Sequence, residues 1–173
     1  MKLEPTDYEM MARALNLATK GIYTSTPNPS VGCVITQNGK IVGEGYTKPA
    51  GGNHAEIEAL SRISDASDCC VYVTLEPCSH YGKTGPCAMA LIDAGVSRVV
   101  VACEDPNPLV SGKGIKLLEE AGIGVDVGLL EDQARALNQG FIKRCEHGLP
   151  WVTIKMASSI DGRTAMASGQ SPW

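Results

Sequence analysis

Two short segments hold the residues whose types and spacing could do chemistry. The first contains His54 and Glu56, and the second contains Cys78 and Cys87 with eight residues between them. One imidazole and two thiolates are ligands that suit a tetrahedral zinc ion. Three protein ligands leave a fourth position for water, whose pKa a bound zinc lowers to roughly 7. Glu56 is then placed to carry a proton as a carboxylate that is not itself a ligand.

The cysteine pattern favours metal binding at this one pair. Four other cysteines lie in apolar runs and are expected to be buried as small hydrophobic side chains: Cys33, Cys69, Cys70 and Cys103. Cys145 lies in a polar helical stretch and is expected to be a free thiol. Only Cys78 and Cys87 have loop-like surroundings rich in glycine and proline. A disulfide, or two incidental thiols, remain the alternatives to a metal site there.

Length and composition predict an ordinary globular chain. It has 173 residues, 43% of them hydrophobic and 20% charged, which suggests one domain with a small additional piece. The net charge of −4 and the lack of a basic run argue against a large nucleic-acid footprint. No apolar run is long enough to cross a membrane, and the first residues do not form a signal peptide. We therefore expect a cytoplasmic location.

The hydrophobic pattern predicts strands that alternate with helices. Asn38-Gly39 between two β-type runs indicates a hairpin, and Thr6 with Glu9 forms a capping box for an opening helix. The expected strands cover 31–36, 40–46, 69–75, 98–103 and 124–128; the expected helices cover 6–20, 54–63, 86–94, 112–121 and 131–146. This order predicts an α/β fold with a mostly parallel sheet after an opening hairpin. His54, Cys78 and Cys87 then lie near helix N-termini on one side of that sheet.

Two further features leave their function open. Asn28 stands between two prolines, so the loop is either a stiff connection or a rigid mount that presents the amide to a ligand. Asn107 lies in a second Pro-Asn-Pro segment. The main rival to a catalytic zinc is a structural zinc knuckle in a binding module, which needs a fourth ligand. His80 and Cys145 are the candidates for that ligand.

Several motifs together resemble a known family. They are Thr26-Pro27-Asn28-Pro29-Ser30-Val31-Gly32-Cys33-Val34, His54-Ala55-Glu56, Thr74-Leu75-Glu76-Pro77-Cys78-Ser79-His80-Tyr81-Gly82-Lys83-Thr84, Pro86-Cys87 and Asp105-Pro106-Asn107-Pro108. Over residues 6–146 the chain resembles the deaminase half of the bifunctional riboflavin-biosynthesis deaminase/reductase. The stretch 154–165 resembles the opening of that family's reductase domain. The long gap between Cys78 and Cys87 distinguishes this family from cytidine and nucleic-acid deaminases.

The resemblance implies a three-layer α/β/α cytidine-deaminase-like fold with a mixed sheet. It implies one zinc ion held by His54, Cys78 and Cys87, with Glu56 as the proton shuttle. The implied reaction is hydrolytic deamination of 2,5-diamino-6-(5-phosphoribosylamino)pyrimidin-4-one. The residues implied to hold this substrate are Asn28, His80, Lys83 and Asn107, although His80 could instead brace its loop. A nucleoside or nucleic-acid base deaminase of the same fold is the alternative within this class.

The resemblance also sets the expected domain boundaries. Residues 1–146 would form the deaminase domain, 147–150 a linker and 151–173 the truncated start of a reductase-like domain, although the tail could instead pack on the first domain. NADPH would bind only if the reductase domain were complete, and this chain offers no cofactor-binding residues for it. The expected partner is a small phosphorylated pyrimidine, without nucleic acid or membrane, and a homo-oligomer is left open. Three positions depart from the family pattern: Thr47 and Glu58, where histidine is common, and Gly85, where proline is common.

Overall fold

One mixed sheet forms the centre of the computed structural model, which describes residues 3–81, 85–108 and 110–171. Its five strands are β1 (Gly32–Gln37), β2 (Lys40–Tyr46), β3 (Cys70–Val73), β4 (Arg98–Val101) and β5 (Gly124–Val127), in the order β2-β1-β3-β4-β5. β1 runs antiparallel to both β2 and β3, whereas β3, β4 and β5 are parallel. The predicted opening hairpin is confirmed, with Asn38 and Gly39 at φ values of 51° and 74° in its turn.

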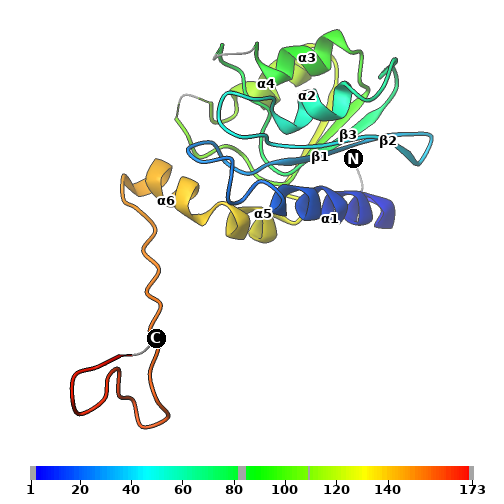
Figure 1. Ribbon diagram of the computed structural model, residues 1–173. Helices are drawn as coiled ribbons and strands as arrows, with labels where there is room; N and C mark the ends of the chain where they lie inside the picture. The colour runs from blue at the N-terminus through cyan, green and yellow to red at the C-terminus, as the bar shows by residue number, and fades with distance from the viewer. Residues whose placement is uncertain (1–2, 82–84, 109, 172–173) are drawn as a thin grey trace.

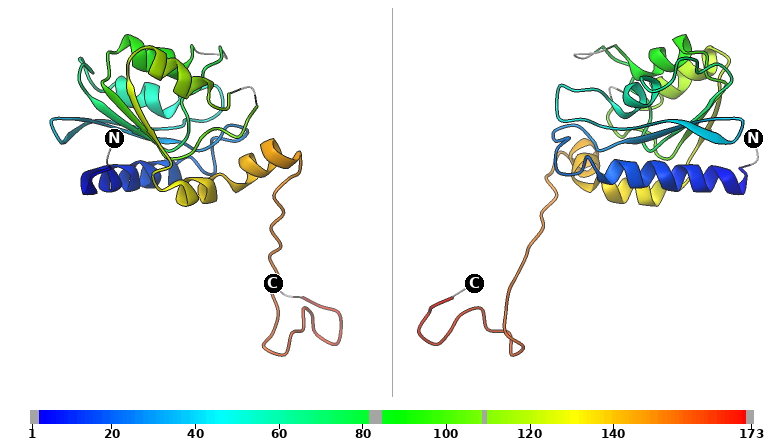
Figure 2. Two further views of the ribbon diagram at one scale, coloured as in Figure 1. Left: turned by 180° about the vertical axis from the view of Figure 1, so that it is seen from behind. Right: turned by 45° about the vertical axis from the view of Figure 1, so that its right-hand side comes forward.

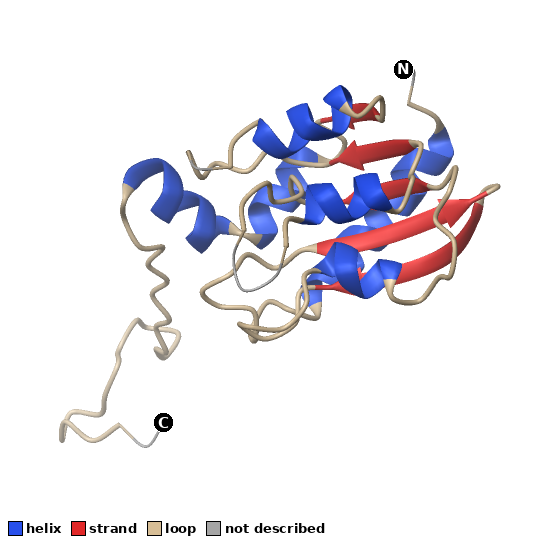
Figure 3. Ribbon diagram, turned by 90° about the horizontal axis from the view of Figure 1, so that it is seen from above, coloured by secondary structure: helices blue, strands red, loops and turns tan. Residues whose placement is uncertain are grey.

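Helices cover both faces of this sheet and make three layers (Figures 1 and 2). On one face lie α1 (Pro5–Thr19) and α5 (Glu131–Leu137), and α6 (Gln139–His147) continues beyond α5. On the other face lie the three short helices that begin close to the candidate site, namely α2 (Ala55–Leu60), α3 (Cys87–Asp93) and α4 (Lys113–Glu120). Figure 3 shows these helices lying over the strands. The predicted three-layer α/β/α architecture is therefore confirmed.

The first helix begins earlier than its sequence pattern predicts. Glu4 is the N-cap and Pro5 the first helical residue, so the predicted capping box of Thr6 and Glu9 is wrong. Proline suits the first helical position because its fixed φ is already helical and its missing N–H would be unpaired there anyway. The Asp7 carboxylate accepts a hydrogen bond from the Glu4 N–H at 2.8 Å, which makes Asp7 the capping carboxylate.

The single helix predicted over 131–146 is also wrong, because the chain breaks it at Asn138. This residue has φ −118° and ψ 27° and separates α5 from α6. Its side chain is buried and bonds the backbone of Ser30 on both sides: it accepts from the Ser30 N–H at 2.8 Å and donates to the Ser30 carbonyl at 2.9 Å. Ser30 ends the Pro-Asn-Pro loop, so the helix break ties that loop to the domain.

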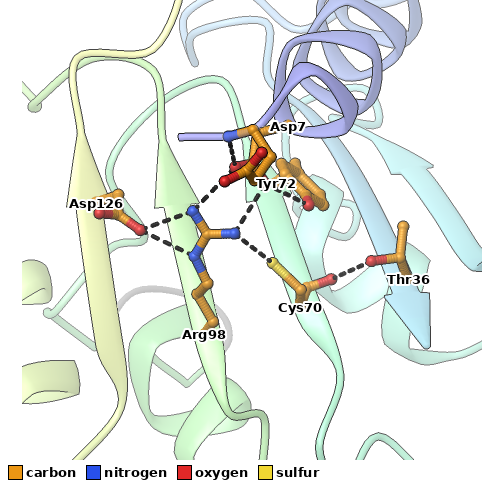
Figure 4. A network of polar contacts seen from close by, with 7 residues as sticks. Asp7, Thr36, Cys70, Tyr72, Arg98 and Asp126 are labelled. Carbon is orange, nitrogen blue, oxygen red and sulfur yellow. Dashed lines mark hydrogen bonds and ion pairs between the residues drawn. The ribbon is translucent and has the colours of Figure 1, made fainter. Parts of the chain in front are cut away.

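The end of the sheet away from the starts of α2, α3 and α4 carries a largely buried polar network (Figure 4). Arg98 at the start of β4 donates to both carboxylate oxygens of Asp7, at 2.8 and 3.2 Å, and to Asp126 at 2.8 Å. The Tyr72 hydroxyl donates to Asp7 at 2.8 Å. Burial raises the pKa of Asp7, but hydrogen bonds, first of all those from Arg98, outweigh it and leave the pKa below its ordinary value. The network fixes α1 to the starts of β3, β4 and β5.

The C-terminal stretch differs from the rest of the chain. From 151 to 171 the residues are exposed and form neither helix nor strand, and the segment extends away from the three layers (Figure 1). The apolar run over 151–156 forms no strand, since a strand needs a neighbour for its backbone hydrogen bonds and none lies beside it here. Among the described residues, no helix combines the length and apolar character that a membrane crossing requires.

Candidate metal centre and its pocket

His54 is placed by the close packing of α2 on the hairpin. It is the N-cap of α2, directly after the Gly-rich loop that follows β2. The helix can approach this closely because Gly45 has no side chain: a Cβ there would lie 2.2 Å from the Ala55 carbonyl oxygen. Any larger residue at 45 would push the start of α2, and the histidine with it, away from the sheet. The helix begins one residue after its predicted start at His54, and it ends at Leu60 rather than at residue 63.

The two cysteines come from neighbouring junctions. Cys78 follows the buried end of β3, and Cys87 is the first residue of α3, with Pro86 as its N-cap. The Cys87 backbone N–H donates to the Cys78 sulfur at 3.3 Å. This N–H is one that a helix leaves without an internal partner, so the start of α3 favours negative charge on Cys78.

The three predicted ligands meet in one group. His54 Nδ1 lies 3.6 Å from the Cys78 sulfur and 3.3 Å from the Cys87 sulfur, and all three ligand atoms lie within 4.8 Å of one another. All seven cysteines are free, so the disulfide alternative fails. Over the described ranges, neither His80 nor Cys145 belongs to this group, and the fourth ligand that a structural zinc knuckle needs is not present among them. A nitrogen and two sulfurs at this spacing fit zinc.

The electrostatics of the group favour a bound cation. Hydrogen bonding within the group, first of all with Cys87, holds the pKa of Cys78 well below its ordinary range despite partial burial. The pKa of Cys87 is raised, chiefly by the same contact with Cys78 and then by burial. The hydrogen bond with Cys78 also raises the pKa of His54. These shifts favour a thiolate at Cys78, and a metal ion would displace the proton that remains on Cys87.

Glu56 lies beside the ligand group and is almost completely buried, with 3% of its surface exposed. Burial first, and then negative charge on Cys78, raise the pKa of its carboxyl to about 7. A carboxyl group with a pKa near neutral can both accept and release a proton. A dication at the neighbouring ligands would draw this pKa down again.

A pocket of about 480 Å³ opens over this group. Three of the four residues predicted to hold substrate line it: Asn28, His80 and Asn107. The fourth, Lys83, lies outside the described residues. The structure therefore brings both Pro-Asn-Pro loops to the same cavity as His54, Cys78 and Glu56. His80 is exposed at this pocket, whereas Asn28 and Asn107 are half-buried.

Sequence reasoning missed several residues of this region. Phe141 and Arg144 of α6 line the pocket, and Arg144 donates to the Pro27 carbonyl at 3.2 Å. A helix that begins about 50 residues after the second motif gives no local signal of such a role, although the Lys-Arg pair at 143–144 offers positive charge. Thr47, where the resembled family often has histidine, is buried, and its hydroxyl accepts from the Val31 N–H at 3.0 Å. It braces the start of β1 beside the pocket.

Comparison with known proteins identifies the class. A family model described as the cytidine and deoxycytidylate deaminase zinc-binding region matches residues 4–103. That span contains His54, Glu56, Cys78 and Cys87. The fold and the ligand group therefore agree with a zinc-binding deaminase.

The relatives narrow this class. The riboflavin biosynthesis protein RibD of Haemophilus influenzae is 56% identical over 100% of this chain and 47% of its own length. The diaminohydroxyphosphoribosylamino-pyrimidine deaminase of Buchnera aphidicola is 50% identical over 81% of this chain and 96% of its own length. The solved structure of Acinetobacter baumannii RibD superposes with a TM-score of 0.93 at 54% identity, over 97% of this chain and 48% of that one. The chain belongs to this riboflavin-biosynthesis deaminase family, and it spans about half the length of the RibD relatives.

Proposed function

We propose that this chain catalyses the hydrolytic deamination of 2,5-diamino-6-(5-phosphoribosylamino)pyrimidin-4-one. The observation that carries the proposal is the meeting of three zinc-type ligands beside a buried carboxylate, where His54, Cys78 and Glu56 line one pocket. The Buchnera relative, which this chain matches over nearly its whole length, is named as a deaminase of such a pyrimidine, which supports the substrate. The expected location is the cytoplasm and the expected partner this small molecule, with homo-oligomerisation left open.

His54, Cys78 and Cys87 would hold the zinc ion through Nδ1 and two sulfurs. The metal would supply a water that is activated for attack on the ring carbon bearing the amino group. Glu56 would take a proton from that water and deliver it to the ring nitrogen. It would then carry a second proton, from the hydroxyl added to the ring, to the amino group that leaves as ammonia. Its burial supports this role, because a carboxylate shielded from bulk water keeps the proton it has taken until a substrate atom accepts it.

The pocket supports recognition of a polar heterocycle with an anionic arm. The amides of Asn28 and Asn107 each offer a donor and an acceptor to the edges of the pyrimidine or to ribose hydroxyls. Arg144 is the one permanent cation among the described residues that line the pocket, and His80 lies exposed there too. We assign the phosphate to Arg144 and His80, together with Lys83, which the structure does not describe.

The domain division is part of the proposal. Residues 1–146 would be the deaminase domain, 147–150 a linker and 151–173 the start of a reductase domain. The exposed path of 151–171 supports this division, as does the existence of the Buchnera relative, which matches over 141 residues. Reduction and NADPH binding would then belong to a longer protein of this family and not to this chain.

Ammonia release is the test of this function. The purified chain is loaded with zinc and assayed with the phosphorylated pyrimidine, with its dephosphorylated form and with cytidine. We expect turnover of the phosphorylated compound to exceed the others. Equal turnover of cytidine would refute the substrate, and no turnover at all would refute the reaction.

A matched pair of variants tests the role of Glu56. Glu56→Ala should lower kcat by about 10²–10⁴-fold, the usual contribution of a general acid–base, while zinc remains bound. Glu58→Gln is the control, because Glu58 lies two residues away on α2 but bonds Asn53 at 2.9 Å outside the pocket. If both variants lose activity equally, the loss comes from disturbance of α2 and the assignment of Glu56 falls.

A further inference from the structure

Glu76 is a buried carboxylate that the proposed chemistry does not use. It follows β3 and stands two residues before Cys78, with 4% of its surface exposed. Its two oxygens accept hydrogen bonds from four backbone N–H groups: Asp105 at 3.1 Å, Gly112 at 3.0 Å, Gly114 at 2.8 Å and Ile115 at 3.3 Å. No other side chain in the hydrogen-bond network of the described residues gathers so many backbone donors.

These donors belong to one stretch of chain, the loop after β4 and the first turn of α4. The first N–H groups of a helix lack internal partners and are usually capped by the side chain of the N-cap residue. The N-cap of α4 is Gly112, which has no side chain to offer. Glu76, which follows β3, supplies this cap from a distant part of the chain. Its negative charge also suits the positive end of the helix.

The packing beside Glu76 is equally close. A Cβ on Gly114 would lie 2.0 Å from the carbonyl oxygen of Pro77, so the first turn of α4 rests directly on the residue before Cys78. The Glu76 N–H in turn donates to the Cys103 carbonyl at 2.9 Å, which extends the pairing of β3 with β4. The segment that carries a metal ligand and the segment that begins α4 are thus held as one body.

The same hydrogen bonds reach the substrate side of the pocket. Glu76 holds the Asp105 N–H, and the Asp105 carboxylate accepts from the Asn107 N–H at 2.8 Å. Asn107 lines the same pocket as His54 and Cys78. A chain of two hydrogen bonds therefore runs from the end of β3 to a residue proposed to bind substrate.

We propose that Glu76 is a positioning residue that fixes residues 104–108 and 110–115, and with them Asn107, at a set distance from the metal centre. This inference rests on the proposed function for its kinetic consequence, but not for the hydrogen bonding itself. Substrate must contact both the metal centre and Asn107, so the spacing between them determines affinity for the bound pyrimidine. Loss of the four hydrogen bonds to Glu76, which we call the clamp, should therefore raise KM more than it lowers kcat.

Glu76→Gln is the test variant, because it keeps the size of the side chain but replaces one acceptor oxygen by an amide donor that faces N–H groups. We expect KM for the phosphorylated pyrimidine to rise by about 10-fold, the equivalent of 1.4 kcal/mol, with kcat changed by much less and zinc stoichiometry unchanged. Hydrogen–deuterium exchange should show faster exchange over 104–115. Glu76→Asp, which keeps the charge but is too short to reach all four donors, serves if the first variant does not fold.

Asp7→Asn is the matched control, since Asp7 is also a buried carboxylate with several donors but lies at the opposite end of the strands. It should lower stability and leave both KM and exchange over 104–115 unchanged. An unchanged KM in both Glu76 variants, or an equal rise in Asp7→Asn, would overturn the inference. If the unaltered chain fails to turn over the pyrimidine, the proposed function fails; unchanged exchange over 104–115 would still overturn the clamp.

Discussion

Asn138 offers a sharp test of how the fold holds the Pro-Asn-Pro loop in place. Asn138→Ala removes both hydrogen bonds to Ser30 and leaves the buried N–H and carbonyl of that residue without partners. It changes no residue that lines the pocket. The effect on substrate binding would therefore pass through the loop that carries Asn28, and not through a lost contact.

The size of the effect follows from these two groups. A buried polar group left without a partner costs about 1–3 kcal/mol, so two such groups cost roughly 2–6 kcal/mol. Alanine favours a continuous helix over 131–147 by at most about 0.7 kcal/mol, which offsets little of this. The unfolding free energy should fall by about 1.5–5 kcal/mol, and Tm by roughly 3–20 °C for a domain of this size.

Urea unfolding followed by circular dichroism measures this change, and steady-state kinetics measures KM. Asn16→Ala is the control, because Asn16 is an exposed residue of α1 and the same substitution there should change stability by less than about 0.5 kcal/mol. A loss below about 1 kcal/mol in Asn138→Ala would refute the claim that these two bonds hold the loop. An unchanged KM together with a large loss of stability would refute the link to Asn28.

Three further predictions concern charge and metal. Because the pKa of Asp7 lies below its ordinary value, its contribution to stability is complete above about pH 4 and is lost as the pH falls through the lower, folded pKa. Asp7→Asn should therefore flatten the decline of unfolding free energy below pH 4, and an equally steep decline would contradict this. Cys78→Ser should abolish stoichiometric zinc binding, measured by metal analysis after dialysis against a weak chelator; retained zinc would remove Cys78 from the ligand set. Arg144→Gln should raise KM about 5- to 10-fold for the phosphorylated pyrimidine but not for its dephosphorylated form, and equal effects on both would exclude a phosphate contact.

The metal ligands could be predicted from sequence because their signal is local. His54 and Cys87 stand where a loop gives way to a helix, and Cys78 lies in the loop between β3 and α3; these junctions are marked by glycine, proline and a change of hydrophobic period. The alternation of strands and helices likewise indicates an α/β fold, whereas the three-layer arrangement is implied by the family resemblance. The convergence of the three ligands also depends on β1 lying beside β3, which the hydrophobic pattern does not reveal.

The missed features depend instead on contacts between distant segments. Asn138 looked like an ordinary polar residue of a helix, and only its contact with Ser30, 108 positions away, reveals the break. Arg144 lies in α6, after that break, and lines the pocket. Glu76 looked like a motif residue next to a ligand, yet its partners lie 29 to 39 positions downstream. Hydrophobic period and turn chemistry carry no information on such pairs.

The positions of these contacts explain how one short domain can separate stability from substrate binding. At the starts of β3, β4 and β5, the Asp7–Arg98 network ties α1 to the sheet and touches nothing in the pocket. At the other ends of the strands, Glu76 and Asn138 each hold one Pro-Asn-Pro loop by its backbone. Those bonds go to backbone N–H and carbonyl groups. They therefore fix the backbone of the loops that carry Asn28 and Asn107, independently of the side chains around them. Substitution at the first end should therefore change stability alone, whereas substitution at the second should change KM as well.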